Sequence, residues 1–140
     1  MAAIEGSIAG KRCLIVDDQF LIAMDIRQIV EAAGAHSVVC VASAEEALAA
    51  IDGAPFDLAI LDVKLGGMLR TSLSVAARLS ADDTPFVFLT GMRSDDPLFR
   101  EFPDVPVVEK PYDVTALLAA LRRAIERQEG LGPTRPPRAS

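Results

Sequence analysis

The chain has 140 residues, of which 51% are hydrophobic, and this composition predicts one globular domain with an aliphatic core. The formal net charge of −6 argues against a nucleic-acid-binding surface, which needs clustered Lys and Arg. No apolar run approaches the roughly 20 residues that span a bilayer, and the first residues lack a signal-peptide pattern, so we expect a cytoplasmic protein without a membrane segment.

Five short apolar runs divide the chain, and each is apolar at consecutive positions rather than at alternate ones. This pattern is typical of strands covered on both faces, as in a parallel sheet. Cys13 and Cys40 lie within the first two runs, where we expect reduced core thiols rather than a disulfide. The predicted strands are CLIV (13–16), VVCV (38–41), LAIL (58–61), FVFL (86–89) and VPVV (105–108).

Segments with helical periodicity separate most of these runs. The alternation predicts an α/β doubly wound parallel sheet with right-handed crossovers and helices on both faces. The predicted helices are one that follows Asp18 and stops at Gly34, one from a capping box at Ser43–Glu46 to Gly53, one over 71–80, and one from the cap Asp113 to about Arg127.

The fourth connection, residues 91–104, is the weakest helical segment. Prolines and a short apolar cluster predict a fourth helix that is either a turn or two long or replaced by a mobile loop. We expect an N-terminal extension at 1–10, the folded domain at 11–127 and a Gly/Pro-rich disordered tail at 128–140.

Polar residues follow four of the predicted strands. Asp17 and Asp18 follow the first run, Asp62 the third, Thr90 the fourth, and Lys110 comes shortly after the fifth. A doubly wound sheet brings the carboxyl ends of its strands to one edge, where ligands bind. We therefore expect three carboxylates, one hydroxyl and one ammonium to share a crevice.

Each of these residues also has a simpler interpretation. Asp17 and Asp18 can cap a helix, Asp62 and Thr90 can form turns, and Lys110 can be a solvated surface residue. None of these roles requires acid, acid, hydroxyl and base after four strands in that order, so a joint site is favoured.

Electrostatics indicate what such a site would bind. Two carboxylates about 4 Å apart repel by roughly 4 kcal/mol at an effective dielectric constant near 20. Lys110 would offset one charge and a divalent ion the rest, and ligands that are all oxygen favour Mg²⁺. The pocket would then suit a phosphoryl group, because Thr90 can donate to its oxygens and a carboxylate can act as the nucleophile that forms an aspartyl phosphate.

The ordered motifs LIVDD (14–18), LDV (61–63), LTG (89–91) and EKP (109–111) resemble the receiver domain of two-component response regulators over about residues 11–126. The resemblance implies a flavodoxin-like five-stranded sheet of order 2-1-3-4-5. It implies that Asp62 is the phosphoacceptor, and that Asp17, Asp18, Asp62 and the backbone carbonyl of Lys64 hold Mg²⁺. Thr90 and Lys110 would bind the phosphoryl oxygens, and a cis Lys110–Pro111 bond is expected.

PFVFLTGM (85–92) is similar to the PFxFATGY signature of the FAT GUY receivers, many of them single-domain proteins of alphaproteobacteria. LDVKLGG, at 61–67, also resembles the loop of that subgroup. Two positions depart from the signature, Leu89 in place of Ala and Met92 in place of Tyr, while Gly91 is kept.

Three positions bear on regulation. Val107 stands where typical receivers carry Tyr or Phe, so no aromatic ring can report phosphorylation there; Tyr112 is expected only to pack. We expect the segment 91–104 to order or shift instead when Thr90 engages the phosphoryl group. Lys64 stands where the subgroup often has Asn. It either screens the acyl phosphate or is a solvated loop lysine.

The resemblance implies a non-enzymatic phosphoacceptor that takes its phosphoryl group from a sensor histidine kinase or a histidine phosphotransfer protein. No effector domain is evident after the last predicted helix, so we expect a stand-alone receiver that acts as a phosphate shuttle or as a phosphorylation-dependent switch for a downstream protein partner. The alternative is an Asp-nucleophile phosphohydrolase, but such enzymes need an acid two residues after the nucleophile, where Lys64 stands. A flavin carrier is less favoured, because the loop after the first strand is acidic.

Overall fold

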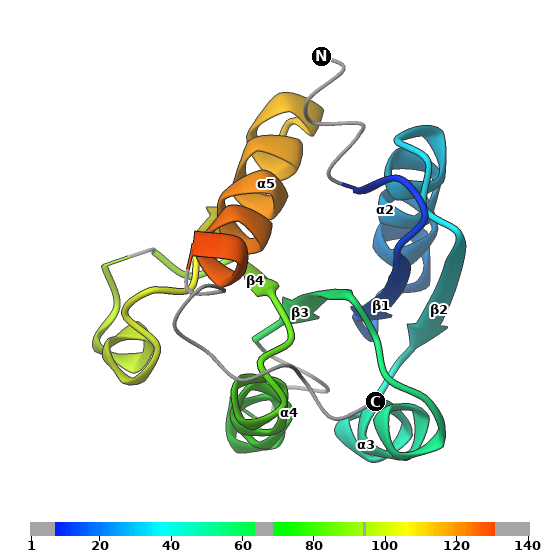
Figure 1. Cartoon of the computed structure of the whole chain (residues 1–140). Coiled ribbons are helices and arrows are strands. Elements are labelled where there is room, and N and C mark those ends of the chain that lie inside the picture. Colours follow the sequence, from blue (N-terminus) through cyan, green and yellow to red (C-terminus); the bar gives the residue numbers. More distant parts are fainter. Residues whose placement is uncertain (1–7, 64–68, 94, 131–140) are drawn as a thin grey trace.

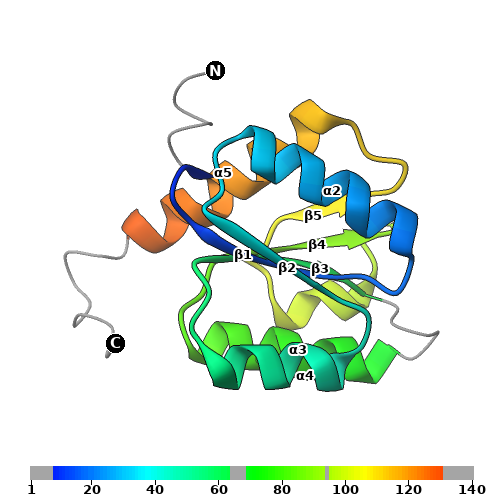
Figure 2. The same cartoon turned by 90° about the vertical axis from the view of Figure 1, so that its right-hand side faces the viewer.

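The computed structural model describes residues 8–63, 69–93 and 95–130, which form a single parallel sheet with helices on both faces (Figure 1, Figure 2). The strands are β1 (Arg12–Val16), β2 (Ser37–Val41), β3 (Leu58–Asp62), β4 (Phe86–Thr90) and β5 (Val107–Glu109). Their order is β2-β1-β3-β4-β5, which confirms the predicted flavodoxin-like topology. The order reverses between β1 and β3, and the chain leaves these two strands toward opposite faces of the sheet; this is the position at which ligands bind in doubly wound sheets.

Helices α2 (Phe20–Ala32) and α5 (Val114–Gly130) cover one face of the sheet, and α3 (Ala44–Gly53) and α4 (Leu69–Ala81) cover the other (Figure 1). Successive strand residues point to opposite faces of the sheet and so contribute to the core on both sides. Cys13 and Ile15 of β1 face the α2–α5 side, whereas Leu14 and Val16 pack on the α3–α4 side. Burial on both faces explains why the strands are apolar at consecutive positions.

Local signals set most of the helix ends. The Ser43 hydroxyl accepts from the Glu46 amide at 3.1 Å, and the Glu46 carboxylate accepts from the Ala42 amide at 2.8 Å. The predicted capping box is therefore present, except that Glu46 bonds to the amide of Ala42 and not to that of Ser43. The Asp113 carboxylate caps α5 by accepting from the Ala116 amide at 2.7 Å. Helix α5 continues to Gly130, past its predicted end.

Gly34 ends α2 at a φ of +103°, a left-handed conformation that favours glycine. A Cβ at this position would lie 3.3 Å from the Cα of Ala9, and the Gly34 carbonyl accepts from the Gly10 amide at 2.9 Å. These contacts hold the segment before β1 against the domain. Ile8, which we expected in an N-terminal extension, is fully buried in the core.

The fourth connection contains only a short 3-10 helix, η1 (Pro97–Glu101), as its prolines predicted. The Asp96 carboxylate caps it by accepting from the Leu98 amide at 2.9 Å. Phe99 anchors it, with its ring centroid 5.3 Å from that of Phe88 in β4. Within the described residues, no helix is both long and apolar enough to cross a membrane.

Candidate functional site

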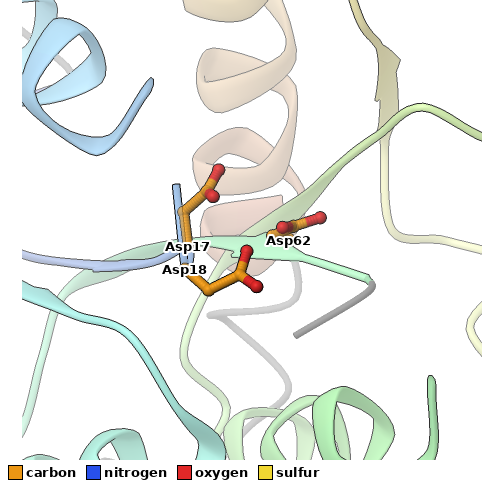
Figure 3. A group of neighbouring side chains, drawn as sticks. All are labelled: Asp17, Asp18 and Asp62. Atoms are coloured by element: carbon orange, nitrogen blue, oxygen red, sulfur yellow. The ribbon is translucent and has the colours of Figure 1, made fainter. Parts of the chain in front are cut away.

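Three carboxylates gather at the carboxyl ends of β1 and β3, on either side of the point where the strand order reverses (Figure 3). Asp17 and Asp18 directly follow β1, and Asp62 is the last residue of β3. One oxygen from each side chain lies within 4.8 Å of the other two. Asp17 and Asp62 are only 4% and 6% exposed, whereas Asp18 is exposed. The predicted cluster of three carboxylates is therefore present.

Asp17 also makes a local hydrogen bond before helix α2, but this bond is not the predicted helix cap. Its Oδ1 accepts from the Gln19 amide at 2.8 Å, while Gln19, the N-cap of α2, makes no side-chain capping bond. Because Gln19 is the N-cap, the Asp17 bond forms a turn before the helix and does not cap it, so the predicted capping role of Asp17 is not observed. The bond to the backbone fixes the direction in which the carboxylate points.

Lys110 supplies a positive charge to the cluster. Its Nζ lies 3.5 Å from Asp17 Oδ2 and 3.8 Å from Asp62 Oδ1, and its side chain is 18% exposed. The Lys110 amide donates to the Thr90 carbonyl at 2.7 Å, which ties the end of β5 to β4, and the Lys110–Pro111 bond is cis, as the resemblance implied. Three carboxylates and one ammonium leave a formal charge of −2, which matches a divalent cation.

Thr90 ends β4, the strand beside Asp62, and it is 1% exposed. Its Oγ1 accepts from the Met92 amide at 2.9 Å, across Gly91. Gly91 is exposed, and a Cβ there would meet nothing within 4 Å. Met92 and Val107 are both half-buried and pack against the α3–α4 side of the core.

The donor chemistry of this cluster fits Mg²⁺, because the three gathered side chains offer only carboxylate oxygens. Lys64, whose carbonyl was predicted as a further ligand, lies outside the described residues. One contact beside the site was not predicted: the Tyr112 hydroxyl donates to the carboxylate of Asp25 in α2. The two residues are 87 positions apart, so no local pattern could have indicated this bond.

Comparisons with known proteins agree with this fold and site. The family model of the response regulator receiver domain matches residues 13–122. The transcriptional regulatory protein YvrH of Bacillus subtilis (strain 168) is 33% identical over 116 residues, which are 81% of this chain and 48% of that protein. TcrA of Mycobacterium tuberculosis is 34% identical over 127 residues, 87% of this chain and 49% of that protein. The chain thus spans about half the length of the curated relatives that it matches.

Two solved structures are similar across most of the chain. The solution structure of SdrG from Sphingomonas melonis Fr1 has a TM-score of 0.67 and 36% identity, with 85% of this chain and 98% of that chain covered. The response regulator PhyR from Brucella abortus has a TM-score of 0.74 over 93% of this chain and 55% of that chain; its identity of 24% supports the fold alone.

Receiver domains are phosphoacceptor signalling domains that bind Mg²⁺ in an acidic pocket and interact with histidine kinases or phosphotransfer proteins. The family match covers the five strands except for Arg12, the first residue of β1, together with the acidic cluster and Lys110. With its sheet order, its acidic cluster and this match in agreement, the chain belongs to the response regulator receiver domain family.

Proposed function

We propose that Asp62 is the phosphoacceptor of this receiver and takes its phosphoryl group from a phosphohistidine on a sensor kinase or a phosphotransfer protein. The observation that carries the proposal is the position of Asp62, which is buried beside the acidic pair Asp17–Asp18 and beside Lys110, where the strand order reverses. Asp17, Asp18 and Asp62, with the carbonyl of Lys64, would hold Mg²⁺.

In the proposed transfer, an Asp62 carboxylate oxygen attacks phosphorus, an O–P bond forms, and the N–P bond to the donor imidazole breaks. Lys110 compensates the negative charge of the phosphoryl oxygens, and the hydroxyl of Thr90 donates to one of them. The bound Mg²⁺ would supply further positive charge. Asp17, held by the Gln19 amide and by Lys110, keeps the acidic pair in place.

We test this assignment by incubation with Mg²⁺ and a small acyl phosphate donor, followed by intact-mass measurement. The expected result is a base-labile gain of one phosphoryl group that is absent when Mg²⁺ is chelated and absent in Asp62→Ala. A gain that persists in Asp62→Ala would reject Asp62 as the acceptor. Turnover of a phosphomonoester in excess over protein would instead identify the phosphohydrolase alternative.

We further propose a stand-alone receiver of the FAT GUY subgroup. The similarity of PFVFLTGM (85–92) to the subgroup signature supports this, as does SdrG, a solved chain that the present sequence covers almost completely. Such a protein would act as a phosphate shuttle or as a switch for a downstream partner. Reversible return of the phosphoryl group to a phosphotransfer histidine favours the shuttle, and a purified partner that binds only phosphorylated protein favours the switch.

A further inference from the structure

A side-chain pair fastens the loop between β5 and α5 to helix α2. The hydroxyl of Tyr112 donates to the carboxylate of Asp25, and the ring of Tyr112 packs against the core on the α2–α5 side. Tyr112 therefore does more than pack, which is all that the sequence predicted. The bond joins the loop to the helix that begins directly after the acidic pair and Gln19.

The same short loop carries Lys110, two residues before Tyr112. The Lys110 amide is bonded to the Thr90 carbonyl at 2.7 Å, so the loop is fixed to β4 at one end and, through Tyr112, to α2 at the other. The lysine side chain is long and has several rotatable bonds, so the position of its ammonium depends on where its backbone is held. Two attachments restrict that backbone more than one does.

Lys110 needs this restriction because it contacts two groups at once. Its Nζ lies between Asp17 and Asp62, at 3.5 and 3.8 Å. The distance between the Lys110 ammonium and Asp17 depends on where the loop lies relative to the start of α2. The Tyr112–Asp25 bond holds the loop against α2. Tyr112, Asp25 and Lys110 also line one groove of about 760 Å³, so the pair and the lysine lie along the same part of the surface.

The protonation state of Tyr112 suits this role. Burial, and then the hydrogen bond to Asp25, raise the pKa of Tyr112 above its ordinary value of 10.0. The phenol therefore keeps its proton at neutral pH and remains a donor. The neighbouring Asp113 is occupied elsewhere, as the cap of α5, and its bond to the Ala116 amide does not connect the loop to α2.

We propose that Tyr112, through its hydrogen bond to Asp25, is a positioning residue that holds Lys110 in place for phosphoryl transfer to Asp62. This inference rests on the proposed function. The hydrogen bond, rather than the ring or the charge of Asp25, does the positioning. That distinction can be tested, because Phe keeps the ring and Asn keeps an oxygen that accepts.

The test compares rates of phosphorylation by a small acyl phosphate in saturating Mg²⁺, followed by intact mass. Tyr112→Phe and Asp25→Ala are each expected to slow the reaction about five- to tenfold, and the double variant no further, because both remove the same bond. Asp25→Asn is expected to stay within about twofold of the wild type, because its side-chain carbonyl still accepts from the phenol.

A control separates positioning from stability. Ser43→Ala removes the cap of α3, far from the loop in sequence, and lowers the free energy of unfolding without changing the phosphorylation rate. A rate for Tyr112→Phe within twofold of the wild type, or an Asp25→Asn variant as slow as Asp25→Ala, would overturn the inference. If the wild type gains no phosphoryl group, or Asp62→Ala still gains one, the proposed function itself fails and this inference with it.

Discussion

Thr90 has its hydroxyl oxygen already engaged by the Met92 amide, at 2.9 Å. A hydroxyl carries one hydrogen and two lone pairs, so this bond occupies one lone pair and leaves the O–H to donate elsewhere. The side chain is 1% exposed, which leaves little water to receive that hydrogen. Thr90 therefore keeps a hydrogen that it can donate once it turns toward a phosphoryl group, as the proposed role requires.

Cys13 gives a prediction at the residue scale. Its thiol is fully buried in β1, and burial, reinforced by the charge of Asp57, raises the pKa of Cys13 from an ordinary value of 9.0 to about 12. We expect alkylation of Cys13 in the native protein at pH 9 to be more than about 100-fold slower than in urea, because reaction requires opening of the sheet. Mass spectrometry after timed alkylation measures this.

The same pKa shift gives a pH dependence with a defined sign. The folded state holds the Cys13 proton more tightly than the unfolded state, so this contribution to stability is present below pH 9 and is lost as the pH rises toward about 12. Cys40 is half-buried on the edge strand β2 and serves as the internal control, reacting faster in the native state. Equal alkylation rates for the two native thiols would contradict the prediction.

At the scale of elements, the first and last residues of most helices and strands could be predicted, because each depends on a few neighbouring residues. The cap at Ser43 and the left-handed Gly34 are examples. The last strand was predicted to begin too early, at Val105, whereas β5 begins at Val107. Pro106 explains the difference: its carbonyl accepts from the Phe88 amide at 3.0 Å, but it has no N–H to donate to the ladder.

The candidate site could be predicted because a parallel sheet brings the ends of distant strands to one edge. That topology alone placed the acidic cluster and Lys110 together. The Tyr112–Asp25 bond and the buried position of Ile8 could not be predicted, because each depends on how a loop or segment packs against a helix remote in sequence. Such contacts produce neither a hydrophobic periodicity nor a motif of neighbouring residues in the sequence.

Helix η1 and the preceding loop give a prediction at the element scale. Met92 is bonded to Thr90, and it packs on the same side of the core as Phe99 and Phe102, while Val107 supplies no ring to swing. If Thr90 turns toward a phosphoryl group, its hydrogen bond to the Met92 amide changes. We expect the segment around Met92 to shift as a result. We expect amide hydrogen exchange over the described residues of 91–104 to change by about tenfold or more with a phosphoryl mimic bound.

Helix α3 is the matched reference for that experiment, since it lies remote from Thr90 in sequence and its cap at Ser43 is independent of the site. Its exchange rates should stay constant. If exchange over the described residues of 91–104 is the same with and without the mimic, this segment does not respond to phosphorylation and the prediction is wrong.

At the scale of the whole molecule, the sheet concentrates negative charge that the fold must carry without its metal. The four charged groups of the site sum to −2, within a chain of net charge −6. A divalent ion that binds only the folded state stabilises it by mass action, by about 2.7 kcal/mol at a concentration 100 times its Kd. We expect the Tm to rise by several degrees as Mg²⁺ is added.

Calorimetry at matched ionic strength tests this expectation, with NaCl replacing MgCl₂ to remove general screening. Asp18→Asn should lose most of the increase, since it removes one gathered carboxylate that is solvent-exposed and does not belong to the core. A rise in Tm of the same size with NaCl alone would show that screening, not a specific site, is responsible.

Ile8 has a practical consequence for anyone who shortens this chain. The family match begins at residue 13, yet Ile8 is buried in the core and the Gly10 amide donates to the Gly34 carbonyl. A fragment that starts at Lys11 would open a cavity that costs about 2–5 kcal/mol, a large share of what holds an average domain folded. Fragments prepared for crystallisation or isotope labelling should therefore start upstream of Ile8.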